Sequence, residues 1–336
     1  MRPRATGFTL LEILVAASLA LLMLGLGMML FSSLLNISDE ATATAEMNQN
    51  LRAAANLISQ DLMMAAAGVP IGGLPLPSGA NAQPVNRPGP CCNTFPAALG
   101  VIPAISPGYG LGPSQASANV DTSYLAGGIT NSDEITILEV DPLSQINQYP
   151  LAAESPTSIT FNAGTNLGSG VSQLRTGDLL MLQNANGSAL AMVTNINGDV
   201  VSLNAGDPLQ INQPNAAAGN FAAILSGSPP TTAYRLLMIS YYLDFSNPNE
   251  PVLMRQLDDQ AAMKVAAYIT GLQFTYDLSD GKTIDQRTVV QPNQIRKVNF
   301  VISARSTHRS LKTGRYYTNS IATAVMIRNL EYRNRY

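Results

Sequence analysis

The sequence has little of the side-chain chemistry on which most enzymes depend. It contains one histidine, His308, two cysteines, Cys91 and Cys92, and no tryptophan. A His/Cys zinc site with the ordinary number of ligands is therefore excluded. A Ser-His-Asp or Cys-His catalytic site would have to use His308, which lies in a strand-like stretch beside Arg305 and Arg309. We expect a protein that is not an enzyme and that holds no metal and no cofactor.

Charge is also scarce and is unevenly distributed. Charged residues make up 12% of the chain, against about 25% in an average protein. Residues 39–294 carry 20 acids and 8 bases, whereas residues 295–336 carry 9 bases and one acid, Glu331. This composition, rich in small polar residues, favours an exported, β-rich protein with a basic C-terminal segment.

The longest uncharged run lies near the N-terminus. Ile13 to Ser38 is 26 residues without a charge, about 39 Å as a helix, which is enough to cross a bilayer. The alternative of a cleavable secretory signal predicts an apolar run of only about 7–15 residues. Apolar or small residues then continue at helical spacing from Leu51 to Ala65, and no proline occurs between Pro3 and Pro70. We therefore expect one helix over residues 8–67, apolar in its first half and amphipathic in its second.

One carboxylate, Glu12, stands at the start of this apolar run. An ionised side chain inside a membrane costs several kcal/mol unless it has a partner, and the only one nearby in the chain is the backbone at the helix start. If the basic leader were cut after Gly7, Phe8 would carry a new cationic amine one helical turn from Glu12. The same amine on a neighbouring copy would give the carboxylate an oppositely charged partner.

These residues match the processing motif of a known family. The run Gly7-Phe8-Thr9-Leu10-Leu11-Glu12, followed by an apolar helix, resembles the class III signal of type IV pilins and of type II secretion pseudopilins. The resemblance implies cleavage between Gly7 and Phe8 by a prepilin peptidase, N-methylation of Phe8, and a role for Glu12 in subunit assembly. One departure is that major pilins commonly carry a proline midway along this segment, where this chain has Gly25 and Gly27.

The resemblance also implies a location and partners. Residues 1–7 would be the cleaved leader, and residues 8–38 would be a single transmembrane segment in the inner membrane, later part of a filament core. The C-terminal domain would lie in the periplasm and, after assembly, in the pilus. The partners would be the prepilin peptidase, other minor and major pilins and the inner membrane. Nucleic acid is not expected as a partner.

Beyond the helix, strand patterns follow an irregular stretch. Residues 68–132 are rich in Pro, Gly, Ser and Asn, which predicts a loop region. Residues 133–336 contain repeated strand patterns, including a section from about 177 to 203 that predicts a small β-hairpin module. DDQAAMKVAAYI has helical character. We expect an α+β, pilin-like fold in which the long helix covers an antiparallel sheet with a small β-rich insertion.

The order of the C-terminal segments is similar to that of large minor pilins of the PilW type, and somewhat less to that of the J-type minor pseudopilin. The segments that carry this likeness are the long strand YRLLMISYYLD, then VAAYITGLQFTYD, then IRKVNFVISARS and a last strand ending IRN. The likeness covers roughly residues 177–330. It implies a minor pilin that helps to start or cap a type IV pilus. The alternatives are a J-type component of a type II secretion system and a tip adhesin or DNA-binding pilin.

Three further features invite a binding role. The adjacent Cys91 and Cys92 allow a vicinal disulfide within one chain, an incidental pair of small residues in a loop or, less favoured, a disulfide between chains. Asp277, Asp280 and Asp285 flank a glycine, but their spacing fails the EF-hand pattern and favours a solvated turn. The basic residues could meet DNA phosphates, although a solvated or subunit-facing strand edge is the better interpretation. The basic set is Arg296, Lys297, Arg305, Arg309, Lys312 and Arg315.

Overall fold

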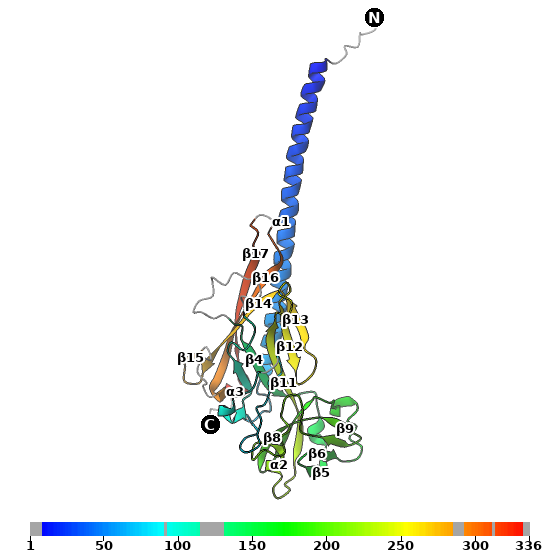
Figure 1. The fold of residues 1–336 in the computed structure, drawn as a ribbon, viewed down its shortest axis with the longest axis vertical. Coiled ribbons are helices and arrows are strands. Elements are labelled where there is room, and N and C mark those ends of the chain that lie inside the picture. The colour runs from blue at the N-terminus through cyan, green and yellow to red at the C-terminus, as the bar shows by residue number, and fades with distance from the viewer. Residues whose placement is uncertain (1–8, 91–92, 115–130, 285–291, 311–312, 332–336) are drawn as a thin grey trace.

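One long helix dominates the fold and extends far beyond the rest of the chain (Figure 1). The structure is a computed structural model that describes residues 9–90, 93–114, 131–284, 292–310 and 313–331. Helix α1 (Leu10–Met64) is 55 residues long, which agrees closely with the helix predicted over residues 8–67. Its first part, through Ile37, is exposed, and one face of its second part is buried against the β-sheets.

The end of α1 is set by local backbone conformation. Ala66 has a left-handed φ of 66°, and Gly68 follows with a φ of 71°, a conformation that glycine adopts without strain. A Cβ on Gly68 would lie 2.8 Å from a methyl group of Val140. The chain therefore turns sharply after the helix and passes close to a strand of the main sheet.

The main sheet has seven strands in the order β13-β12-β11-β4-β3, with β7 paired to β11 and β8 paired to β7. Every pairing between them is antiparallel. The strands are β3 (Ile105–Gly108), β4 (Glu134–Val140), β7 (Leu179–Asn184), β8 (Gly187–Met192), β11 (Thr232–Asp244), β12 (Val252–Leu257) and β13 (Met263–Ala267). The long strand expected at YRLLMISYYLD is confirmed as β11, and it pairs with β12, which contains PVLMRQL from Val252 onward.

A second antiparallel sheet is formed by the C-terminal strands in the order β15-β14-β16-β17. They are β14 (Ile269–Leu278), β15 (Thr283–Ile284), β16 (Ile295–Arg309) and β17 (Tyr316–Met326). Val298, Phe300 and Ile302 alternate along β16 and are fully buried, as the period-two pattern predicts. They share one core with Leu51, Ile58 and Leu62 of α1, so the helix covers a sheet face as expected. The fold is α+β.

A third, small sheet lies at the end of the molecule opposite the exposed helix (Figure 1). Its order is β5-β6-β10-β9, with strands β5 (Leu151–Ser155), β6 (Ser158–Phe161), β9 (Asn195–Asn197) and β10 (Val200–Ser202). Its core, which includes Ile159, Phe161 and Val201, is separate from the main one. The section 177–203, predicted as one module, is thus divided: β7 and β8 join the main sheet, and β9 and β10 join the small one.

Two further expectations need correction. The stretch 68–132 was predicted as an irregular loop region, but it contributes β1 (Leu74–Pro75), β2 (Val101–Ile102) and β3, and buries Leu74, Ile102 and Ile105 completely. The helical character predicted around Met263–Ala267 is wrong, because these residues form β13 against β12; sheet pairing overrides their intrinsic helix preference. The remaining short elements are η1 (Ala97–Leu99), η3 (Ile146–Gln148), η4 (Gly170–Ser172), α2 (Phe221–Ile224), η5 (Pro292–Gln294) and α3 (Arg328–Glu331).

Candidate functional site

The first turn of α1 is closed by a reciprocal pair of side chains. The Thr9 backbone N–H and hydroxyl both donate to Oε2 of Glu12, at 2.9 and 3.0 Å, and the Glu12 N–H donates to the Thr9 hydroxyl at 3.3 Å. This is a capping box, in which two otherwise unpaired donors at a helix start are satisfied. Thr9 was not predicted as a capping residue, although the spacing Thr-x-x-Glu is the signature of this motif.

The capping box leaves half of the carboxylate available. Both bonds from Thr9 end on Oε2, and among the described residues Oε1 of Glu12 accepts no hydrogen bond. The side chain is exposed. Glu12 can therefore cap its own helix and accept a cation from a second chain at the same time. Gly7 and Phe8, the predicted cleavage and methylation residues, lie outside the described residues.

The surface next to Glu12 is almost entirely apolar. Large side chains from Leu10 to Ile37 have exposed fractions of 50% or more, with Leu10 at 81%. Soluble proteins rarely expose a continuous apolar surface of this extent. Within the described residues, α1 is the one helix long and apolar enough to cross a membrane. This exposed segment requires either lipid or other apolar helices around it.

A buried polar cluster joins the packed half of α1 to the main sheet. Asp61 of α1 accepts a hydrogen bond of 2.6 Å from the Tyr241 hydroxyl and one of 2.7 Å from Nε of Arg255. Burial, together with the neighbouring Asp61 carboxylate, raises the pKa of Tyr241, so this hydroxyl stays a donor. Glu139 lies nearby; burial and then the Asp61 charge raise its pKa to about 7. The cluster therefore ties the C-terminal part of α1 to strands β11 and β12.

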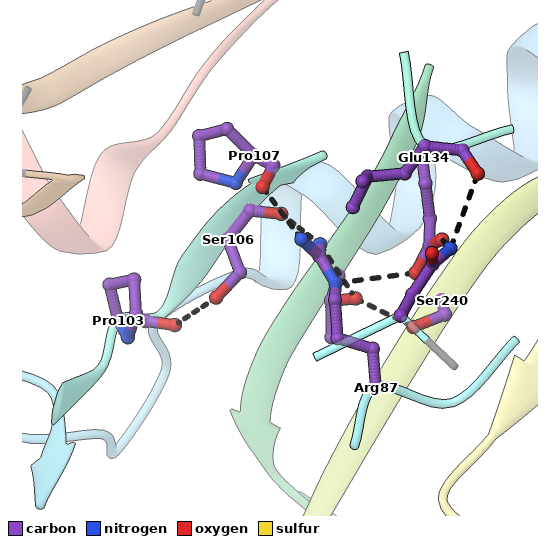
Figure 2. A network of polar contacts seen from close by, with 9 residues as sticks. Arg87, Pro103, Ser106, Pro107, Glu134 and Ser240 are labelled. Carbon is purple, nitrogen blue, oxygen red and sulfur yellow. Dashed lines mark hydrogen bonds and ion pairs between the residues drawn. The ribbon is translucent and has the colours of Figure 1, made fainter. Parts of the chain in front are cut away.

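A second buried network holds the segment that leads to Cys91 and Cys92. Arg87 is 3% exposed; its guanidinium donates to the carbonyls of Ser106 at 2.6 Å and Pro107 at 2.7 Å, and its Nε lies 3.3 Å from Oε1 of Glu134 (Figure 2). Burial raises the pKa of Glu134 even though Arg87 opposes this shift. On the far side of the two cysteines, Asn93 donates to Glu134 at 2.9 Å. Cys91 and Cys92 themselves lie outside the described residues.

Some of the basic C-terminal residues make contacts inside the folded domain. Arg305 is 1% exposed, donates to the carbonyls of Pro248 and Asn249 at 2.8 and 3.0 Å, and lies 4.2 Å from the centre of the Tyr316 ring. The expectation that Arg305 belongs to a solvated edge is therefore wrong. Arg309 contacts the same ring at 5.0 Å but is exposed. A guanidinium buried in this way is not available to a phosphate backbone.

Other members of this set are paired with nearby groups. Lys297 forms an ion pair with Asp277, and Arg296 donates to the Asn293 carbonyl at 2.8 Å. Asp280 pairs with Lys282 at 3.2 Å, as expected for a turn. Asp285 and Lys312 lie outside the described residues, and no group of three potential metal ligands occurs among the residues that the structure describes.

The described residues thus combine three features: an exposed apolar helix segment, a carboxylate near its start, and a buried polar cluster that joins the helix to a β domain. Comparison with family models, with curated proteins and with solved structures finds no match to this chain.

Proposed function

We propose that this chain is a minor pilin, a non-enzymatic subunit that is anchored in the inner membrane and helps to start a type IV pilus. One observation carries the proposal: the exposed apolar part of α1 bears a carboxylate near its start and continues as the helix that packs against the β domain. A plain membrane anchor would need no carboxylate in its apolar segment. The pilin-like fold and the PilW-type likeness belong to the same proposal.

The proposed mechanism has three steps. The precursor waits in the membrane with its β domain in the periplasm, consistent with a basic leader on the cytoplasmic side. The prepilin peptidase removes residues 1–7, which frees an amine on Phe8, and this amine is then methylated. The exposed segment finally leaves lipid for a bundle of equivalent helices. Because both surroundings are apolar, the transfer is nearly neutral, and close packing and polar pairing direct it.

Pairing of Glu12 with a neighbouring subunit would favour the transfer from lipid into the helix bundle. In the part of the chain that the structure describes, Oε2 accepts both Thr9 bonds and Oε1 accepts none. The cationic amine of a neighbouring subunit would approach Oε1 without breaking the capping box. A charge-assisted hydrogen bond contributes about 1.5–3 kcal/mol, more where water is excluded. The capping box therefore uses one oxygen of the carboxylate, and the proposed second partner would use the other.

Substitutions at the capping box separate the two roles of Glu12. Gln keeps a capping box but removes the charge, so E12Q should be processed normally and enter filaments about tenfold less than wild type. T9A removes the two hydroxyl bonds of the cap but keeps the charge and the backbone N–H of residue 9, which donates to Oε2 of Glu12, so its incorporation should stay near the wild-type level. The measurement is the amount of each variant in sheared filaments relative to membranes. If E12Q assembles like wild type, or if T9A fails as severely as E12Q, the pairing role of Glu12 is wrong.

A further inference from the structure

The closed end of the β16–β17 hairpin lies beside α1 where its apolar segment ends (Figure 1). The Ser310 hydroxyl donates to Oε1 of Glu40 at 3.1 Å and ties the hairpin to the helix. Asp39 is the first charged residue after Glu12, so the hydrocarbon region of a membrane crossed by α1 would end just before it. The hairpin end therefore lies at the level of lipid headgroups.

A groove of about 650 Å³ separates the helix from the hairpin at this level. Its helix wall carries Asp39 and Glu40, and its hairpin wall carries His308, Arg309 and Ser310. The side chains of Asp39 and Arg309 are both exposed. A guanidinium is well suited to a phosphate group, and a carboxylate is suited to an ammonium group. The groove thus offers a cationic and an anionic wall at one membrane depth.

A second groove, which is shallow, apolar and formed by one face of α1 alone, adjoins the first. It is lined by Gly27, Met28, Phe31 and Leu35, and it shares Asn36 and Asp39 with the polar groove. The two grooves together form an amphiphilic site whose apolar part runs into the membrane. A nucleic acid or an acidic peptide would meet the two carboxylates of the helix wall, whereas a lipid with both charges on its headgroup matches the two walls.

We propose that this double groove binds a phospholipid with a zwitterionic phosphoethanolamine headgroup. Arg309 contacts the phosphate, Asp39 accepts hydrogen bonds from the ammonium group, and the acyl chain lies along Gly27 and Leu35. The bound lipid fills the space between the hairpin and α1 while the subunit is in the membrane. This inference rests on the membrane anchorage in the proposed function, but not on assembly into a pilus.

The test uses the full chain in nanodiscs that contain phosphatidylethanolamine, phosphatidylcholine and phosphatidylglycerol in equal amounts. Lipids retained by the protein after mild extraction are identified by native mass spectrometry. Wild type should retain phosphatidylethanolamine about tenfold more than phosphatidylcholine, whose methylated ammonium cannot donate a hydrogen bond to Asp39. D39N should remove this preference. R309Q should lower retention of all three lipids about tenfold, whereas R315Q, an equal charge change on the same hairpin outside the groove, should not.

A second pair of variants tests the apolar groove without touching a charge. A Cβ at Gly27 or Gly25 would meet no atom within 4 Å, and both positions lie on the exposed part of α1, so neither change should disturb the fold. G27L places a side chain in the groove and should lower lipid retention, whereas G25L should leave it unchanged.

Three results would overturn the inference. They are equal retention of phosphatidylethanolamine and phosphatidylcholine, equal loss in R309Q and R315Q, and retention of a second copy of the chain in place of lipid.

Flotation of the wild-type chain with vesicles separates this inference from the proposed function. A chain that floats but retains no lipid contradicts only the lipid site, whereas a chain that does not float contradicts the membrane anchor as well.

Discussion

Glu139 is a buried acid whose charge the domain tolerates poorly. It is 6% exposed; burial and the Asp61 and Asp141 charges raise its pKa to about 7, and Arg255 only partly opposes them. Because the folded state holds the proton more tightly than the unfolded state, stability that is present at low pH is lost as the pH rises from about 4.5 to about 7.

The substitution E139Q should remove this pH dependence. Between pH 5 and pH 8, the free energy of unfolding of wild type should fall by about 2 kcal/mol more than that of E139Q. Chemical unfolding of both proteins in detergent, followed by tyrosine circular dichroism at the two pH values, gives the difference directly. Parallel pH profiles of the two proteins would show that Glu139 titrates normally in the folded state.

Contacts between residues that are far apart in the sequence could not be predicted from sequence patterns. Glu12 was recognised from its place in an apolar run, but the pairing of Asp61 with Tyr241 and Arg255 joins residues 180 and 194 positions apart. No local spacing encodes such a contact. The burial of Arg305 was missed for the same reason, because its carbonyl partners at Pro248 and Asn249 come from a distant turn.

The two halves of helix α1 differ in how far their side chains are buried. Leu62 is fully buried in the main core, whereas Leu22, on the same helix, is 61% exposed. The first half should therefore contribute little to the stability of the β domain, and the second half should contribute much.

A matched pair of leucine substitutions tests this division. L62A should lower the free energy of unfolding by about 3 kcal/mol, because it leaves a cavity under the sheet. L22A should leave it unchanged within about 0.5 kcal/mol. The measurement is chemical unfolding of both variants, again followed by the tyrosine signal of the β domain. Comparable losses in the two variants would show that the halves are not independent.

Elements with strong periodicity were predicted well, and elements defined by pairing were not. The helix and the strands β11, β14, β16 and β17 were predicted from the spacing of apolar residues in the sequence. β13 was mistaken for a helix because its short run of Ala and Met residues carries no strand pattern, and only its partner β12 makes it a strand. β1 and β2 were missed because two residues each are too short for any pattern.

At the scale of the whole molecule, the exposed helix and the small sheet lie at opposite ends (Figure 1). In a membrane-anchored subunit this arrangement places β5, β6, β9 and β10 farthest from the bilayer. In a filament the same arrangement would place the apolar helix inside and the β domain outside. The filament placement, unlike the membrane placement, depends on the release of the N-terminal amine that Glu12 is proposed to meet.

Intact mass of the chain purified from membranes tests the central claim most directly. The mass should correspond to residues 8–336 with one added methyl group, and G7A should retain residues 1–7. Because the two forms differ by the whole leader, a single spectrum separates them. A wild-type mass corresponding to residues 1–336 would contradict the account, since the amine proposed as the partner of Glu12 would not exist.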